Sequence, residues 1–148
     1  MYDNSVKEDK MKKKVLIVDD DKEFCEEAAD ALRYEGYEVE TSYDGLDASS
    51  LIDAGNYDAV VLDLKLPGMS GSDILKGIKE TKKDVHVIIC SGQSTLLKKF
   101  EEKGCKENEE CKIMGLADSI ISKPVTLASL LAAVKKIVHR DHKEKDKN

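Results

Sequence analysis

Short apolar runs recur along the chain, and each of them stops at polar or turn-forming residues. Five of these runs have the length and the β-branched content of buried strands. They span residues 14–18, 37–41, 59–62, 85–90 and 119–122. The run at 59–62 is apolar at every position, which is typical of a central strand covered on both faces of a parallel sheet. We expect the fold to be built around this strand.

Between these runs, apolar residues recur at helical spacing, and polar caps or glycines mark the helix ends. Asp21 and Gly36 bound the first expected helix, and Asp44 and Gly55 bound the second. Ser70 caps the third helix. The fourth starts near Ser94 and stops before Gly104, and the fifth runs from about Thr126 to Val138. Residues 1–13 and 141–148 are polar and lack apolar periodicity, so we expect a flexible N-terminal arm and a polar C-terminal tail.

Five strands that alternate with helices predict a doubly wound α/β fold with a five-stranded parallel sheet. Because the crossovers between parallel strands are right-handed, few topologies remain, and the flavodoxin-like (βα)5 order 2-1-3-4-5 is the usual one. We expect the pattern to form one domain over residues 14–140, without an internal repeat or a second domain. A polar, charged stretch at 104–114 interrupts the pattern before the fifth strand.

The composition excludes several classes of function. At 148 residues with a net charge of −6, the chain has no overall attraction for nucleic acid or for an anionic membrane. No apolar run approaches the ~20 residues of a membrane helix, and no signal peptide opens the sequence. We therefore expect a cytoplasmic protein that neither enters a membrane nor binds nucleic acid directly.

The four cysteines show neither a CxxC pair nor zinc-finger spacing. Cys25 and Cys90 fall in apolar stretches, where a free cysteine behaves as a small core residue. Cys105 and Cys111 lie in the polar stretch at 104–114, where a reversible disulfide or a metal contact is an alternative. Free thiols are the favoured interpretation, since disulfides are rare in the cytosol.

Polar residues with reactive side chains end four of the predicted strands. Asp19 and Asp20 follow the first, Asp63 ends the third, Ser91 the fourth and Lys123 the fifth. The carboxyl ends of parallel strands lie along one edge, where ligands bind in this class of fold. Three close carboxylates repel one another unless a cation lies among them, and oxygen ligands suit a hard ion such as Mg²⁺ or Mn²⁺. With that charge neutralised, Asp63 can attack phosphorus, while Lys123 and Ser91 contact the phosphoryl oxygens.

Four short motifs at these strand ends resemble the receiver domain of bacterial two-component response regulators. They are Val15-Leu16-Ile17-Val18-Asp19-Asp20, Asp63 with Leu66-Pro67 and Gly71, Ser91-Gly92, and Ser122-Lys123-Pro124. The resemblance covers about residues 13–140. Each motif alone is weak, but four of them in the right order on the right strand ends are highly specific.

The resemblance implies a role for each of these site residues. Asp63 would be the phosphoacceptor, Asp20 and Asp63 would bind Mg²⁺ directly, Asp19 would bind it through water, the Lys65 backbone carbonyl would be a further ligand, and Ser91 and Lys123 would contact the phosphoryl group. A cis peptide would precede Pro124. A single-domain, CheY-like receiver would take its phosphoryl group from a sensor histidine kinase or a histidine phosphotransfer protein. It would then signal by binding a downstream protein, as a phosphoacceptor and not as an enzyme.

Three features depart from the family pattern. In the first, Lys65 and Gln93 occupy positions that in the family tune the loss of phosphate. A long lysine beside Asp63 could obstruct the attacking water, so we expect a phosphoryl lifetime of minutes or longer.

The other two departures lie between the fourth and fifth predicted strands and at the fifth. Family members commonly carry tyrosine or phenylalanine three residues before the conserved lysine, where this chain has Ile120. An aliphatic side chain cannot reproduce the inward swing of such a ring, so the usual coupling would be weakened or rerouted. The stretch from Ser91 to Lys123 is also longer than is usual, with the excess near 104–114. This insertion is either a partner-specific graft or a neutral loop expansion.

Three other functions compete with this interpretation. A receiver-like docking module would act without phosphorylation, although the acidic residues at the strand ends argue against it. A flavodoxin-type small-molecule binder would need a glycine-rich phosphate loop after the first strand, and Asp19-Asp20-Asp21 stands there instead. A hydrolase that forms an aspartyl phosphate would need an acid or base beside Asp63, and Lys65 is a poor candidate.

Overall fold

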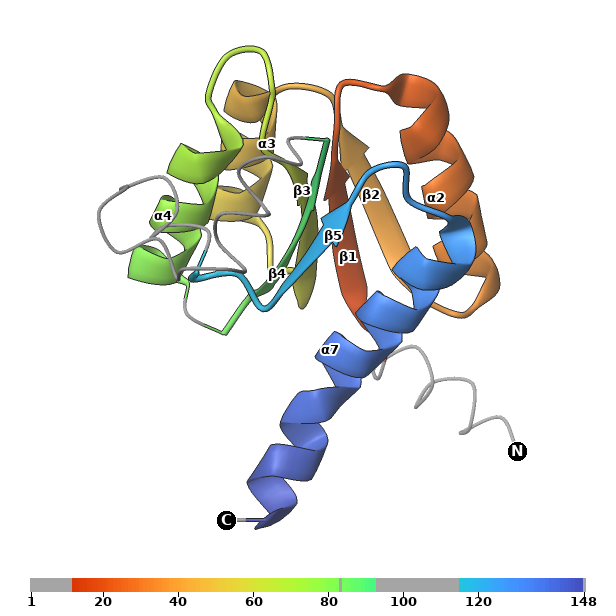
Figure 1. Ribbon diagram of the computed structural model, residues 1–148. Coiled ribbons are helices and arrows are strands. Elements are labelled where there is room, and N and C mark those ends of the chain that lie inside the picture. The colour runs from red at the N-terminus through yellow and green to blue at the C-terminus, as the bar shows by residue number, and fades with distance from the viewer. Residues whose placement is uncertain (1–11, 83, 93–114, 148) are drawn as a thin grey trace.

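A five-stranded parallel sheet with helices on both faces forms the protein (Figure 1). The computed structural model describes residues 12–82, 84–92 and 115–147. The elements are β1 (Lys14–Val18), α2 (Lys22–Tyr34), β2 (Glu38–Ser42), α3 (Gly45–Ala54), β3 (Ala59–Asp63), α4 (Gly71–Thr81), β4 (His86–Ser91), β5 (Ser119–Ser122) and α7 (Leu127–Lys147). The strand order is β2-β1-β3-β4-β5, which confirms the predicted flavodoxin-like topology.

Successive residues of the central strands supply two separate hydrophobic layers. In β1, Val15 and Ile17 face α2 and α7, whereas Leu16 and Val18 face α3 and α4. Figure 1 shows these two pairs of helices on opposite sides of the sheet. Every residue of β3 is buried, as the uniformly apolar sequence of residues 59–62 predicts, and the buried set includes Asp63 at its end.

Three helices begin at the predicted caps. Asp21, Asp44 and Ser70 each accept a hydrogen bond from the backbone N–H three residues further on, at the starts of α2, α3 and α4. These side chains satisfy amides that have no partner within the helix. None of the helices in the described ranges combines the length and the apolar character needed to cross a bilayer.

The predicted bounds of three strands are wrong by one residue, and β2 and β4 are displaced at both ends. β2 starts at Glu38, not at Tyr37, because the Tyr37 N–H donates to the Leu32 carbonyl in the turn that closes α2. That amide is therefore not available to the β ladder. β4 starts at His86 and ends at Ser91, one residue later than predicted at both ends, and Ser91 pairs in register with Ser122 of β5. β3 includes Asp63, one residue beyond the predicted run, because Asp63 pairs with Cys90.

The last helix is also longer than predicted. The apolar stripe stops at Val138, but α7 continues to Lys147 and extends beyond the sheet (Figure 1). Residues 139–147 contain neither glycine nor proline, and acidic and basic residues alternate at spacings that support a helix. The end of an apolar stripe therefore did not mark the end of the helix. The helix predicted near Ser94, the insertion at 104–114 with its two cysteines, and residues 1–11 of the predicted arm lie outside the described residues.

Asp118 links α4, β4 and β5 at the edge of the sheet where the strands begin. Its carboxylate accepts hydrogen bonds from the Val87 N–H at 2.8 Å and from Lys79 Nζ at 3.2 Å, and it lies 3.4 Å from His86 Nδ1. Burial on its own raises the pKa of Asp118, but His86, the Val87 amide and Lys79 together lower it to about 2. The ionised carboxylate is therefore the form that stabilises the fold.

We expect Asp118→Asn to lower the free energy of unfolding by about 1–3 kcal/mol at pH 7, because three donors lose their charged acceptor. The folded-state pKa of Asp118 lies below the unfolded value of about 3.9. Its contribution is therefore complete above pH ~4 and is lost as the pH falls toward 2. Urea unfolding followed by circular dichroism at pH 7, 4 and 3 would measure this contribution to the free energy of unfolding. The exposed Asp84 provides the control Asp84→Asn, and a difference between wild type and Asp118→Asn that does not change with pH would contradict the assignment.

Candidate functional site

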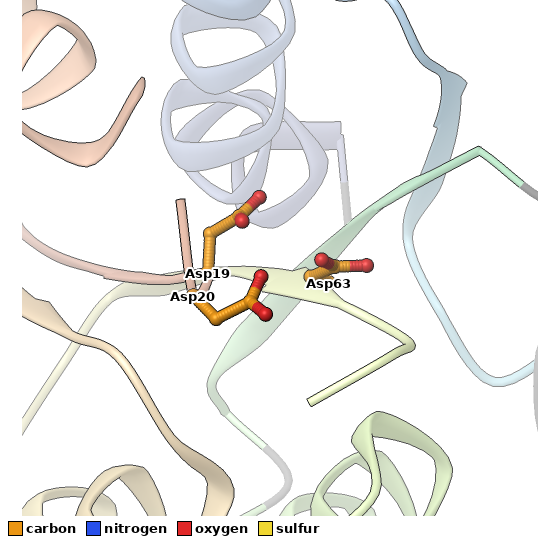
Figure 2. Close-up of side chains that lie close together, drawn as sticks. All are labelled: Asp19, Asp20 and Asp63. Atoms are coloured by element: carbon orange, nitrogen blue, oxygen red, sulfur yellow. The ribbon is translucent and has the colours of Figure 1, made fainter. Parts of the chain in front are cut away.

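Three carboxylates gather at the edge of the sheet where the strands end. Asp19, Asp20 and Asp63 each offer an oxygen, and these oxygens all lie within 4.8 Å of one another (Figure 2). The β1–β3 register explains this, because Val18 is level with Leu62 and the next residues are Asp19 and Asp63. Asp19 and Asp63 are buried, whereas Asp20 is exposed. Within the described ranges this is the one cluster of three or more acidic, histidine or cysteine side chains with such spacing.

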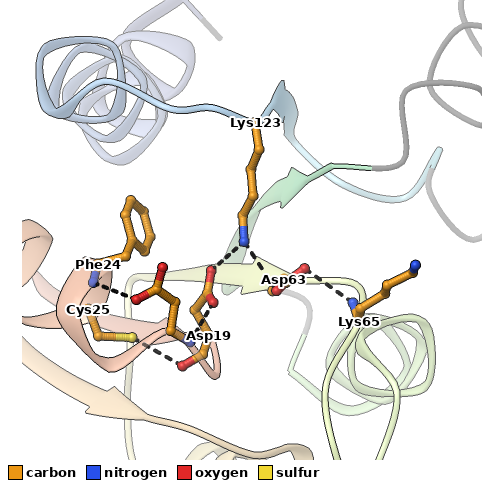
Figure 3. A network of polar contacts seen from close by, with 7 residues as sticks. Asp19, Phe24, Cys25, Asp63, Lys65 and Lys123 are labelled. Carbon is orange, nitrogen blue, oxygen red and sulfur yellow. Dashed lines mark hydrogen bonds and ion pairs between the residues drawn. The ribbon is translucent and has the colours of Figure 1, made fainter.

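Lys123 reaches into this cluster from the end of β5. Its Nζ lies 2.8 Å from Asp19 Oδ2 and 3.2 Å from Asp63 Oδ2 (Figure 3). Its backbone N–H donates to the Ser91 carbonyl, so the β4–β5 ladder sets where the side chain leaves the sheet. The peptide between Lys123 and Pro124 is cis. With three carboxylates against one ammonium, the cluster keeps an excess of negative charge.

Both oxygens of Asp63 have donors. Oδ1 accepts the backbone N–H of Lys65 at 3.1 Å, and Oδ2 faces the Lys123 ammonium. Burial raises the pKa of Asp63, the nearby Asp19 charge raises it further, and the Lys65 amide and Lys123 oppose the change only in part. Burial also disfavours the charged form of Lys123, but its hydrogen bonds and charge interactions with Asp19 and Asp63 raise its pKa overall. A divalent cation beside these carboxylates would favour their ionised forms.

The start of α2 holds Asp19 in place. Asp19 Oδ1 accepts the Asp21 N–H at 2.9 Å, and the Asp19 backbone carbonyl accepts the Cys25 thiol at 3.2 Å. Burial, with the nearby Asp19 and Asp21 charges, raises the pKa of Cys25 to about 12, so the thiol stays protonated. Cys25 was expected to be a plain core residue, and its hydrogen bond to Asp19 has no signal in the sequence.

The remaining predicted site residues lie around Asp63. Ser91 is buried at the end of β4, one residue beyond Cys90, which is level with Asp63 in the ladder. Lys65 is exposed, and its side chain points away from Asp63 while its amide points toward it (Figure 3). Ile120 is half-buried and packs against the core layer beneath α3 and α4.

Two glycines hold the loop that follows Asp63, residues 64–70. The Gly71 N–H donates to the Leu64 carbonyl at 3.1 Å, and the Gly45 N–H donates to the Pro67 carbonyl at 2.9 Å. A Cβ on Gly71 would lie 2.4 Å from the Asp63 carbonyl oxygen, and one on Gly45 would lie 1.8 Å from the Met69 carbonyl oxygen. No side chain fits at either place. Gly71 belongs to the motif recognised in the sequence, whereas Gly45 lies inside the helix expected between Asp44 and Gly55 and carries no such signal.

The oxygen donors of the cluster fit a hard divalent cation. Asp19, Asp20 and Asp63 supply carboxylate oxygens of the kind that Mg²⁺ and Mn²⁺ prefer. The cluster also has the excess negative charge that such an ion would neutralise. Its chemistry therefore fits a metal-assisted reaction at the Asp63 carboxylate.

Comparisons with known proteins point to one family. The model of the response regulator receiver domain matches residues 15–135. The response regulator MprA of Mycobacterium avium (strain 104) is 27% identical over 136 residues, which cover 90% of this chain and 54% of that protein. The chain thus spans about half the length of the curated relatives it matches.

Solved structures share the fold over nearly the whole chain. A CheY-like response regulator receiver domain protein from Methanospirillum hungatei JF-1 is 27% identical, with a TM-score of 0.75 over 90% of this chain and 98% of that one. The response regulator TrrA from Thermotoga maritima, solved in complex with Mg²⁺-BeF, is 30% identical, with a TM-score of 0.69 over 84% of this chain and 98% of that one.

Proposed function

The chain belongs to the response regulator receiver domain family, and from this membership we propose that it accepts a phosphoryl group on the Asp63 carboxylate. Receiver domains are signalling phosphoacceptors of two-component systems and not classical enzymes. The observation that carries the proposal is the position of Asp63, a buried carboxylate between the Lys123 ammonium and two further carboxylates. A solvated surface aspartate would have neither neighbour.

In the proposed reaction, a carboxylate oxygen of Asp63 attacks the phosphorus of a phosphohistidine. The new P–O bond forms as the P–N bond breaks, and the imidazole leaves with the electron pair. The Lys123 ammonium, already 3.2 Å from Asp63 Oδ2, lies where it can stabilise the charge on the phosphoryl oxygens. The Ser91 hydroxyl would donate to another of these oxygens.

A divalent cation belongs to this proposal. Asp20 and Asp63 would hold Mg²⁺ or Mn²⁺ directly, Asp19 would hold it through water, and the Lys65 carbonyl would be a further ligand. When bound, the ion neutralises the carboxylates and stabilises charge on the phosphoryl group. Asp20 is the one exposed member of the carboxylate cluster, so it can be replaced with little change to the core.

We expect Asp20→Asn to weaken Mg²⁺ binding by about tenfold or more, because a ligand charge is lost. Isothermal titration calorimetry with MgCl₂ would measure the affinity. The matched control is Asp21→Asn, which removes a charge next to the site while asparagine still caps α2. Equal affinities of Asp20→Asn and Asp21→Asn would contradict the metal assignment. No Mg²⁺ binding by the wild type would favour the docking module that acts without phosphorylation.

The expected partners follow from the family. A sensor histidine kinase or a histidine phosphotransfer protein would supply the phosphoryl group, and a downstream protein would bind the phosphorylated form. The hydrolase alternative would be supported instead if the protein turned over a phosphate ester repeatedly in the presence of Mg²⁺.

A further inference from the structure

The Lys123 ammonium has a third neighbour besides the two carboxylates, the ring of Phe24. Nζ lies 5.9 Å from the ring centroid, a distance at which an aromatic face attracts a cation. Phe24 is the third residue of α2, is half-buried and packs against the core layer beneath α2 and α7. Figure 3 shows the ring near Asp19 and the Lys123 side chain. A ring fixed on a helix is a better support than one on a loop.

The contacts of Lys123 with its neighbours would respond differently to a bound cation. Its shortest contact, 2.8 Å, is with Asp19 Oδ2, and Asp19 belongs to the cluster of carboxylates that fits a divalent ion. An ion held there repels the ammonium and competes with it for the carboxylates. The ring of Phe24 has no oxygen to offer the ion, so its attraction for the ammonium remains.

We propose that Phe24 is a positioning residue, whose ring keeps the Lys123 ammonium beside Asp63 during phosphoryl transfer. The inference rests on the proposed function, because it assigns Phe24 a role in that reaction. An aromatic face attracts the charge without accepting strong hydrogen bonds, so it does not compete with phosphoryl oxygens for the N–H groups of the lysine. The two carboxylates also attract the ammonium, but they accept its hydrogen bonds.

We expect Phe24→Leu to lower the rate of phosphorylation by acetyl phosphate and Mg²⁺ about two- to fivefold. In this reaction the acyl P–O bond breaks, acetate leaves with the electron pair, and phosphorus bonds to an Asp63 oxygen. Phe24→Tyr keeps the ring and should keep the rate. The control is Tyr43→Leu, because Tyr43 packs against the same core layer as Phe24. The cation over the Tyr43 ring is Lys22, whose Nζ lies 5.3 Å from the ring centroid.

Two further measurements separate positioning from a structural effect. The ring should shift the NMR signals of the Lys123 side chain, and this shift should persist with Mg²⁺, vanish in Phe24→Leu and remain in Phe24→Tyr. Calorimetry should show the same Mg²⁺ affinity in all these variants. A changed affinity in Phe24→Leu would mean that Asp19, which the start of α2 holds, has moved, and this would overturn the proposal.

A wild-type rate in Phe24→Leu, or a slow Phe24→Tyr, would also overturn the inference. If the wild type itself takes no phosphoryl group, the proposed function fails instead. The NMR shift then still decides whether the ring holds the ammonium, because that measurement needs no reaction.

Discussion

Replacing Asp63 with alanine is expected to abolish phosphorylation by acetyl phosphate. Intact-mass analysis after incubation with Mg²⁺ should show one phosphoryl group on the wild type and none on the variant. The reason is that the other carboxylates of the cluster have different surroundings. Asp19 is bound by Lys123 and by the Asp21 N–H, and Asp20 is exposed to solvent. Asp63 also has a backbone amide and the Lys123 ammonium as donors, but it lies 3.2 Å from Lys123 Nζ against 2.8 Å for Asp19, and its side chain is 8% exposed against 2%. Asp63 is therefore the more accessible of the two buried carboxylates.

The matched control is Asp53→Ala, which removes an exposed aspartate from α3 and should leave phosphorylation unchanged. Circular dichroism must show that Asp63→Ala is folded, since the substitution leaves Lys123 with one carboxylate fewer. A phosphoryl group on Asp63→Ala would place the acceptor elsewhere. No phosphoryl group on either protein would favour the docking module.

The fold was largely predictable from the sequence because its signals are local. Buried parallel strands are apolar at nearly every position, and the caps Asp21, Asp44 and Ser70 stand where the helices begin. Strand ends were less predictable, because hydrogen bonds decide them. Tyr37 reads as the start of a strand, but its amide closes α2. The end of α7 was missed because a polar helix carries no apolar signal.

The candidate site was predictable only in part. In a parallel sheet, residues that follow adjacent strands meet at one edge, so Asp19 and Asp63 could be brought together from the sequence. The approach of Phe24 to Lys123 depends on where α2 and the residue after β5 place the two side chains, and no spacing in the sequence encodes it. The same holds for Gly45, whose neighbour Met69 lies on a different segment.

The second large effect concerns Gly71, which begins α4 directly beside Asp63. We expect Gly71→Ala to lower the free energy of unfolding by at least about 1–3 kcal/mol, since the new Cβ would lie 2.4 Å from the Asp63 carbonyl oxygen. The Asp63 backbone would have to move, so under the proposed function phosphorylation should slow as well. Urea unfolding and intact-mass kinetics would measure the two effects.

Gly77 supplies the matched control, because it lies in the same helix and a Cβ there would meet nothing within 4 Å. Gly77→Ala should therefore raise the free energy of unfolding by about 0.4–1 kcal/mol, through a less flexible unfolded chain. The two variants make the same chemical change, so helix propensity alone predicts the same gain for both. Changes of opposite sign in the free energy of unfolding would show that the close approach of Gly71 to the Asp63 backbone leaves no room for a side chain. Equal free energies of unfolding for Gly71→Ala and Gly77→Ala would mean that the loop after Asp63 accommodates the new Cβ without cost. The role given to Gly71 would then be wrong.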